Sequence, residues 1–273
     1  MSEATTTDED RAQQSHEGSA GTPEGRRMIR LLWDPPGPAT RGRKQRISLD
    51  EVVAGAVALA DADGFEALTM RGLAKHLGVG AMSLYTYVPG KAELFELMID
   101  RAYAGRARPD AGLPWRARYE GHAREALAMY RRHPWLLESN LWRLPIGPHV
   151  LDITEDMLAV GRAAGLSAAY GVRLATLLES YAYGIARGEI VDESEARRTG
   201  QTVDDFWSAR SDFWGTYFDP ARFPMMLRTW ESGAYDEEAD PALDLAFALG
   251  LILDSVERLV ATEGGQRADE ADT

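Results

Sequence analysis

Apolar positions along the chain recur every three to four residues, and no segment sustains an alternation of period two. A helical period of this kind buries one face of each helix. Proline and glycine interrupt the pattern and divide it into separate elements. The segments predicted to be helical are 48–63, 69–77, 81–88, 91–102, 115–133, 149–164, 167–189, 202–217, 220–232 and 241–262. The sequence therefore predicts an all-α fold, and it contains no internal repeats.

Local signals mark the ends of the first helices. Ser48 and Glu51 have the spacing of a capping box, in which each side chain satisfies a backbone N–H of the other residue's turn. Gly64 ends that helix, and Thr69 is a suitable N-cap for the next one. Gly78 suits the left-handed position that follows a helix. These signals predict a compact group of short helices.

Composition shifts divide the chain into four regions. Residues 1–40 are predicted to be a mostly disordered extension, although the short apolar run near Trp33 could pack against the rest of the protein. Residues 41–106 form a first helical domain and residues 109–263 a second, larger one, with a polar loop at 191–200. A disordered tail, 264–273, is expected to follow.

The composition excludes several classes of protein. The 273 residues include no cysteine, which excludes disulfides, thiolate catalysis and cysteine-ligated zinc. No apolar run approaches the ~20 residues that a membrane-spanning helix needs. The acidic, polar N-terminus also lacks the apolar core of a secretory signal. We therefore expect a cytoplasmic protein without a membrane partner.

The net charge of −13 argues against a nucleic-acid partner, but the charges are unevenly distributed. Residues 26–108 carry 13 basic and nine acidic side chains, whereas residues 109–273 carry 16 basic and 28 acidic ones. Attraction to DNA depends on the local field rather than on the total charge. Residues 26–108, which contain the first helical domain, are thus the cationic part of an acidic chain.

The segment Leu68–Lys91 has the pattern of a helix, a tight turn and a second short helix. In a helix-turn-helix, the second helix presents its first turn to base edges in the major groove. Leu84 and Val88 lie one turn apart and are predicted to face inward. The side chains predicted to face outward are those of Ala81, Met82, Ser83, Thr86 and Tyr87.

The residues of this segment resemble the pattern of the TetR family of transcriptional regulators. The matching positions are Thr69, Arg71, Leu73-Ala74, Leu77-Gly78-Val79, Ser83-Leu84-Tyr85, Tyr87-Val88 and Lys91. With the preceding helix, the resemblance covers about residues 46–106. The remaining body is similar to the tetracycline-repressor-like branch in the number and length of its helices.

The resemblance implies a repressor that binds palindromic double-stranded operator DNA as a homodimer. The residues implied to contact DNA are Thr69, Arg71, Gly80, Ala81, Met82, Ser83, Tyr85, Thr86, Tyr87 and Lys91. Among them, residues 80–83 match the base-reading turn, and Lys91 matches a phosphate clamp. The basic stub Arg41–Arg46 is either a minor-groove arm or a solvated linker.

The larger domain is expected to dimerise and to bind a small-molecule inducer. The interface is predicted on 167–189 and 241–262, where Ala242, Ala246 and Gly250 allow close approach and Leu249 and Leu253 pack beside them. An apolar pocket with a few polar groups is expected from the clustered aromatic residues. Its candidate residues are Trp115, Tyr119, Trp135, Trp142, Met157, Arg173, Leu177, Glu179, Tyr181, Phe206, Phe213 and Trp214. The five histidines form no legible metal-ligand set, so we expect a hydrophobic inducer and neither metal nor cofactor.

Two other functions fit parts of the sequence less well. An enzyme would need a catalytic constellation, but the chain contains no HExxH motif, phosphate-binding glycine loop or nucleophile elbow. A DNA-binding activator or architectural protein without a ligand would not need so large an aromatic C-terminal body. Release from DNA by a ligand would discriminate between these alternatives.

Overall fold

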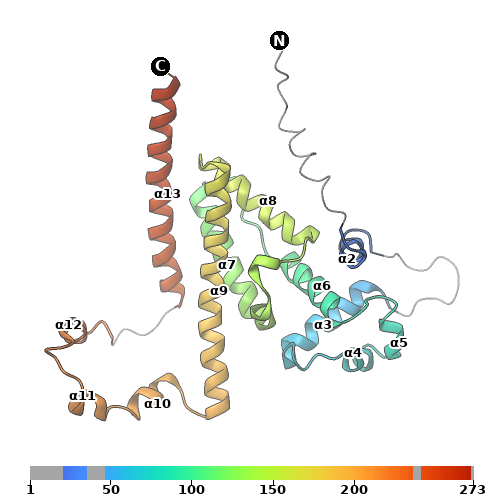
Figure 1. The fold of residues 1–273 in the computed structure, drawn as a ribbon, viewed down its shortest axis with the longest axis horizontal. Helices are drawn as coiled ribbons and strands as arrows, with labels where there is room; N and C mark the ends of the chain where they lie inside the picture. The colour runs from blue at the N-terminus through green and yellow to red at the C-terminus, as the bar shows by residue number, and fades with distance from the viewer. Residues whose placement is uncertain (1–20, 36–46, 236–240, 272–273) are drawn as a thin grey trace.

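The computed structural model describes residues 21–35, 47–235 and 241–271, and within these ranges every regular element is a helix (Figure 1). The predicted all-α fold is confirmed. The helices are α2 (Pro23–Trp33), α3 (Leu49–Asp63), α4 (Met70–His76), α5 (Ala81–Leu84), α6 (Lys91–Ala104), α7 (Trp115–Arg132), α8 (Pro148–Ala163), α9 (Ala168–Thr199), α10 (Val203–Ser208), α11 (Asp212–Thr216), α12 (Pro224–Glu231) and α13 (Pro241–Ala271). Two 3₁₀ turns, η1 (Pro134–Glu138) and η2 (Leu141–Arg143), lie between α7 and α8.

Helices α3 to α6 form the N-terminal domain. The predicted capping box is present, because Ser48 accepts from the Glu51 N–H and the Glu51 carboxylate accepts from the Ser48 N–H. Gly64 ends α3 at φ +83°. A Cβ at Gly55 would come within 2.9 Å of the Leu77 side chain, so glycine permits the close approach of α3 to the end of α4.

Helix α2 lies within the region predicted to be mostly disordered. Its buried side chains Met28, Leu31 and Leu32 pack toward α6, and the Trp33 indole N–H donates to the Ile146 carbonyl at 2.8 Å. The apolar run that ends at Trp33 thus forms an amphipathic helix, which packs against α6.

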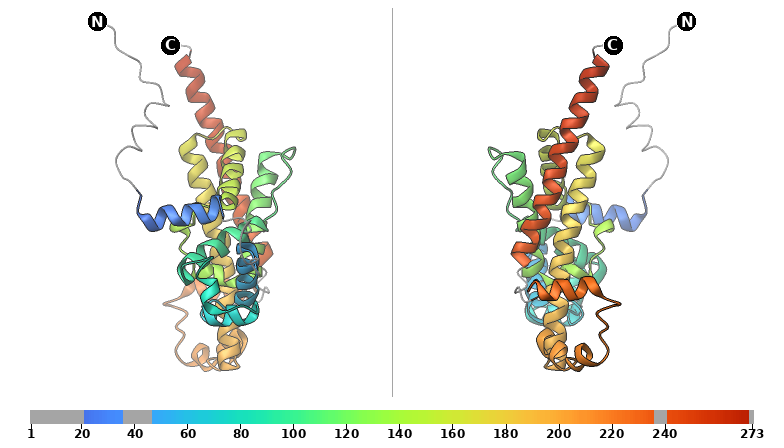
Figure 2. Two further views of the ribbon diagram at one scale, coloured as in Figure 1. Left: turned by 90° about the vertical axis from the view of Figure 1, so that its right-hand side faces the viewer. Right: turned by 90° about the vertical axis from the view of Figure 1, so that its left-hand side faces the viewer.

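The C-terminal domain is organised around the long helix α9. Helices α7 and α8 pack along α9, and α13 lies beside it (Figure 1, Figure 2). The buried face of α9 carries Gly171, Leu174, Leu178, Ala182 and Ala186. These residues follow the helical period that the sequence predicted for its first half.

Helix α9 continues through the segment predicted to be a polar loop and ends at Gly200, which has φ +70°. No proline or glycine interrupts residues 191–199, and ion pairs from Arg197 to Glu193 and from Arg198 to Glu195 span one turn of the helix. The loop expectation was wrong because a polar helix needs no buried face when its side chains pair in solvent.

The following segments also differ from the predictions. The single helix expected over 202–217 is divided into α10 and α11, and α12 is shorter than the predicted 220–232. None of these three helices buries a residue, so together they form an exposed arm (Figure 2). Helix α13 extends to Ala271, into the predicted disordered tail.

Helix α6 joins the two domains, because it packs against α3 on one side and α8 on the other. The buried carboxylate of Asp100 accepts from the backbone N–H groups of His149 and Val150, at 3.0 and 3.1 Å. It thereby caps the N-terminus of α8, where a negative charge also complements the helix dipole. A Cβ on Gly147 would collide with this carboxylate, so a glycine is needed there.

A buried polar cluster joins α7 to α8. Nε2 of His122 lies 2.7 Å from the Asp156 carboxylate, and Arg118 donates to the same carboxylate at 2.8 Å. Burial, followed by the charge of Arg106, lowers the pKa of His122 below its ordinary value. The imidazole is therefore neutral in the folded protein at neutral pH.

This lowered pKa makes the folded protein sensitive to acid. Below about pH 6.5 the unfolded chain protonates His122 before the folded chain does, so the free energy of unfolding decreases as pH falls. One such proton contributes at most about 1.4 kcal/mol per pH unit. Denaturant unfolding between pH 7.5 and 5.5 should show a shallower loss of stability for His122→Gln than for the wild type. Parallel pH dependences would contradict the assignment.

Candidate nucleic-acid interface and ligand cavity

Helices α4 and α5 form the predicted helix-turn-helix. The hydroxyl of Thr69 accepts from the Gly72 N–H at 3.0 Å and caps α4, as expected from the sequence. Gly78, at φ +66°, turns the chain between the two helices. Leu84 and Val88 are fully buried, which confirms their predicted inward orientation. The core thus fixes which side of α5 remains exposed.

The outer side of the motif carries most of the residues predicted to contact DNA. Met82 is 78% exposed and Tyr85 is 42% exposed. The side chains of Arg71, Ser83 and Thr86 are also exposed, Gly80 is exposed at the N-cap of α5, and Ala81 is partly buried. The Thr86 hydroxyl donates to the Ser83 carbonyl at 2.6 Å. This face combines apolar, hydroxyl and cationic groups, which is the chemistry needed for base edges and phosphates.

Tyr87 does not face outward as predicted. Its side chain is 8% exposed, and its hydroxyl donates to the Ile47 carbonyl at 2.7 Å. The prediction assumed a helix over 81–88, but α5 ends at Leu84 and a turn follows. The turn rotates Tyr87 into the core, where it holds the segment that precedes α3.

The ammonium group of Lys91 points toward the protein. It donates to the Phe65 carbonyl at 2.6 Å and lies 4.1 Å from the centre of the Phe65 ring. These contacts secure the loop between α3 and α4. Binding of a phosphate by Lys91 stays a prediction, as does the role of the basic stub Arg41–Arg46, which lies outside the described residues.

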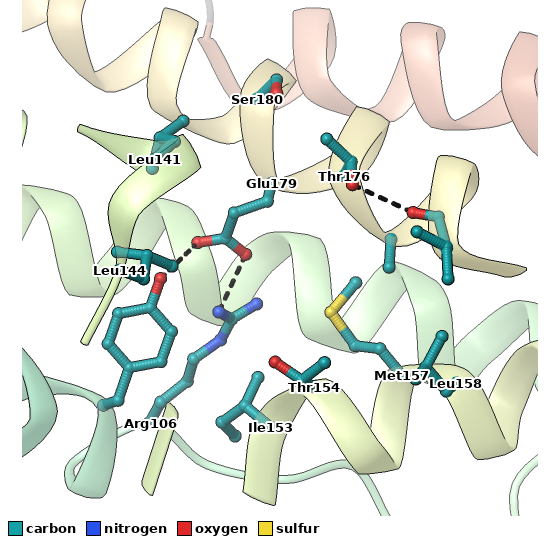
Figure 3. Close-up of a pocket in the computed structure, with 13 residues that line it drawn as sticks. Arg106, Leu141, Leu144, Ile153, Thr154, Met157, Leu158, Thr176, Glu179 and Ser180 are labelled. Atoms are coloured by element: carbon teal, nitrogen blue, oxygen red, sulfur yellow. Dashed lines mark hydrogen bonds and ion pairs between the residues drawn. The ribbon is translucent and has the colours of Figure 1, made fainter. Parts of the chain in front are cut away.

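A cavity of about 170 Å³ lies between the end of α6, the turn η2 and helices α8 and α9 (Figure 3). Its walls are mainly apolar. The lining residues are Tyr103, Arg106, Leu141, Leu144, Ile153, Thr154, Met157, Leu158, Val172, Ala175, Thr176, Glu179 and Ser180. The cavity therefore contacts both the helix that leaves the DNA-binding motif and the central helix of the C-terminal domain.

The polar wall of this cavity is centred on Glu179. Its carboxylate accepts from Arg106 at 2.9 Å, from the Tyr130 hydroxyl at 2.8 Å and from the Tyr103 hydroxyl at 3.2 Å. Burial, and then the charge of Glu179, raise the pKa of both tyrosines above its ordinary value. Both hydroxyls therefore remain protonated donors to the carboxylate.

The structure brings two of the twelve candidate ligand residues, Met157 and Glu179, to this cavity. Arg173 and Leu177 instead line a groove between α9 and α13. The Tyr181 hydroxyl donates to the Asp244 carbonyl at 3.3 Å and links the same two helices. The prediction grouped these residues because they share one helix, but they lie on different faces of it.

The remaining aromatic candidates have other positions. Tyr119 is fully buried and its hydroxyl donates to the Met157 carbonyl behind the cavity, while Trp115 packs edge-on against the Tyr119 ring. Trp135 is buried and donates to Asp61. Phe206, Phe213 and Trp214 belong to the exposed arm, and the Trp142 side chain lies outside the described residues.

Sequence reasoning missed Arg106, the cationic residue of the cavity. Its side chain is 1% exposed, although it stands in the polar sequence Arg-Ala-Arg that follows Gly105. No local feature of such a segment indicates that its arginine is buried. The burial of Arg106 is recognised only when α6 and α9, which are far apart in the chain, are placed together.

Comparisons with known proteins agree with this two-domain arrangement. Residues 52–98 match the family described as bacterial regulatory proteins, tetR family, and residues 108–260 match the tetracyclin repressor-like C-terminal domain. The chain belongs to the TetR family of transcriptional regulators. Its assignment to this family confirms the resemblance found in the helix-turn-helix segment.

Relatives and solved structures of the TetR family extend over most of the chain. The repressor DrrR1 of Streptomyces coeruleorubidus is 40% identical over 255 residues, which cover 92% of each chain. The structure of apo ActR from Streptomyces coelicolor has a TM-score of 0.62 at 23% identity and covers 81% of this chain and all of its own. ActR in complex with actinorhodin has a TM-score of 0.63 at 23% identity, covering 78% of this chain and 98% of its own.

Among the described residues, no helix has the length and hydropathy needed to cross a membrane. In the same part of the chain, no cluster of three histidine or carboxylate side chains is arranged to hold a metal ion.

The buried position of Tyr87 predicts that this residue contributes to the stability of the fold and not to the recognition of DNA bases. Tyr87→Phe should lower the free energy of unfolding by about 1 kcal/mol, because the Ile47 carbonyl loses its hydrogen bond. The sequence preference for DNA should not change. Denaturant unfolding would measure the change in stability, and selection from random duplexes would measure the sequence preference. A changed preference would contradict this prediction and indicate that Tyr87 contacts bases.

Proposed function

We propose that this protein is a ligand-responsive repressor that binds a palindromic operator as a homodimer in the cytoplasm and is released by a mainly apolar small molecule. The observation that carries the proposal is the position of α6, which belongs to the helix-turn-helix core and also ends at the wall of the cavity. The similarity to the repressor DrrR1 supports repression, and the complex of the structurally similar ActR with actinorhodin supports a ligand of this type.

The proposed dimer uses the exposed apolar faces of α9 and α13. Phe247 is 70% exposed and Leu251 is 56% exposed on α13, near Leu177 on α9, which is 49% exposed. Large adjacent apolar side chains of this kind favour an interface. Ala246 is exposed, and Gly250 has open space at its Cβ position, as the predicted close approach requires.

One detail of the predicted interface was wrong. Leu249 and Leu253 are 2% and 0% exposed within a single chain, so they belong to the monomer core. On the helical period they lie opposite Leu251 and far from Phe247. The same helix therefore has one apolar face for the core and another available to a partner.

Dimerisation can be tested with a charge on that exposed face. Phe247→Glu would place two carboxylates near the two-fold axis, so we expect a monomer in sedimentation velocity at micromolar concentration, where the wild type is a dimer. Leu113→Glu, at a position 46% exposed before α7, is the matched control and should remain dimeric. A dimer that survives Phe247→Glu, or a monomeric wild type, would contradict this interface.

DNA recognition can be tested by selecting binding sites from random duplex DNA. We expect a palindrome, and Ser83→Ala should change the preferred base at one position of each half-site. Tyr85→Phe should instead weaken all duplexes about tenfold, because a phosphate loses a hydrogen bond without any change in base readout. Fluorescence anisotropy at fixed salt would measure both variants.

Tyr217→Phe on the exposed arm is the matched control for Tyr85→Phe, since Tyr217 is 74% exposed and lies far from α5 along the chain. Its affinity for the selected duplex should equal that of the wild type. Recovery of no motif from the selection would contradict operator binding. Operator binding that no small molecule reverses would instead favour an activator or architectural protein.

A further inference from the structure

Arg106 occupies an unusual position in the cavity. It follows the C-cap of α6, and its guanidinium is almost fully buried between Glu179 and the His122 carbonyl, at 2.9 Å from each. Its Nε–H has no hydrogen-bond partner. Figure 3 shows the Arg106 guanidinium in direct contact with the Glu179 carboxylate at the cavity wall. A buried donor without a partner costs free energy that a ligand oxygen could recover.

Two threonine hydroxyls at the cavity wall already have partners within their own helices. The Thr154 hydroxyl donates to the Val150 carbonyl at 2.9 Å, and the Thr176 hydroxyl donates to the Val172 carbonyl at 3.0 Å. Arg106 thus offers the ligand a cationic donor in a mainly apolar space. A carboxylate or carbonyl oxygen is the complementary group, because a hydrogen bond from a charged guanidinium is stronger than one between neutral groups.

The size of the cavity implies that binding moves its walls. Its volume of about 170 Å³ is below the ~300 Å³ at which pockets for drug-sized ligands begin. A larger ligand must separate α6, α8 and α9, and the Arg106–Glu179 pair is a contact that joins α6 to α9 at this point. Tyr103 and Tyr130 would still satisfy the Glu179 carboxylate after Arg106 has left it.

We propose that Arg106 recognises an acceptor oxygen, carboxylate or carbonyl, on an otherwise apolar ligand, and that it exchanges Glu179 for this oxygen. The exchange removes the ion pair between the end of α6 and α9 and leaves the longer Tyr103–Glu179 hydrogen bond as the polar contact between them. The inference rests on the proposed function, because it names the ligand class and the contact through which that ligand acts. The exchange leaves both charged groups hydrogen-bonded: the ligand oxygen accepts from Arg106, and the two neutral tyrosine hydroxyls continue to donate to Glu179.

The ligand chemistry can be tested on the full-length wild type with three matched probes: 2-naphthoate, 2-acetylnaphthalene and naphthalene. Isothermal titration calorimetry should give at least tenfold tighter binding for the two oxygen-bearing probes than for the hydrocarbon. Equal affinities for all three, or binding of none, would overturn the proposal. The same oxygen-bearing probes should release the operator duplex obtained by selection.

Two variants test the exchange itself. Arg106→Met should retain naphthalene binding but lose the tenfold preference for oxygen. Glu179→Gln should bind 2-naphthoate at least tenfold more tightly than the wild type, because the competing carboxylate charge is gone. A retained preference in Arg106→Met, or unchanged affinity in Glu179→Gln, would contradict the exchange. Because Glu179→Gln preserves the size and acceptor oxygen of the side chain, it keeps the test decisive if Arg106→Met fails to fold.

Arg131→Met is the matched control. Arg131 forms an ion pair with Glu189 that also joins α7 to α9, at 2.5 Å, but neither residue lines the cavity. This variant should bind the three probes as the wild type does. If the wild type binds no selected operator, the proposed repressor function fails. If a ligand releases the operator equally from the wild type and Arg106→Met, this inference alone fails.

Discussion

The attachment of helix α6 at two polar anchors is the constraint on which the rest of the structure depends. In its C-terminal half, the buried Asp100 carboxylate caps the N-terminus of α8. Just beyond its end, Arg106 pairs with Glu179 on α9. Both contacts are hydrogen-bonded and directional, so α6 cannot rotate or slide without breaking one of them. The same helix buries Leu94 and Met98, which places the helix-turn-helix at a fixed angle to the C-terminal domain.

The cavity lies between the two helices that hold these anchors. A ligand that separates α8 from α9 pulls the two anchors of α6 apart, and a helix held at both points must then tilt or release one of them. In the proposed repressor, this displacement changes the spacing of the two recognition helices in the dimer. The ligand needs to favour the displaced state by only about 1–3 kcal/mol to change operator affinity by 5- to 150-fold.

The sequence predicted those features that depend on neighbours close in the chain. Local backbone chemistry predicted where helices begin and end. The structure confirms the N-caps Ser48 and Thr69 and the C-cap Gly64. Tyr87 was misplaced because α5 ends at Leu84, where no adjacent glycine or proline marks the end of the helix in the sequence. The prediction applied helical spacing to residues 85–88, which follow α5, and therefore gave the Tyr87 side chain the wrong direction.

The cavity was harder to predict because its polar wall comes from distant parts of the chain. Arg106 follows the end of α6 and Glu179 lies on α9, so their contact is set by the tertiary structure. Nothing local distinguishes Arg106 from a solvated arginine. Glu179 was recognisable as a charged residue on a mostly apolar helix, and it does line the cavity. Aromatic residues were a weaker guide to the cavity, since some of them pack in the core and others lie on the exposed arm.

The central claim is that the Arg106–Glu179 pair controls the position of the recognition helices. The absence of cysteine permits a single spin label at Met82→Cys, a position 78% exposed on α5. Pulsed electron paramagnetic resonance can then measure the distance between the two labels of the dimer without any ligand. The account predicts a shifted or broadened distance distribution when Glu179→Gln is added, and an unchanged one when Arg131→Met is added. Identical distributions for the Glu179→Gln protein and its parent would contradict the account.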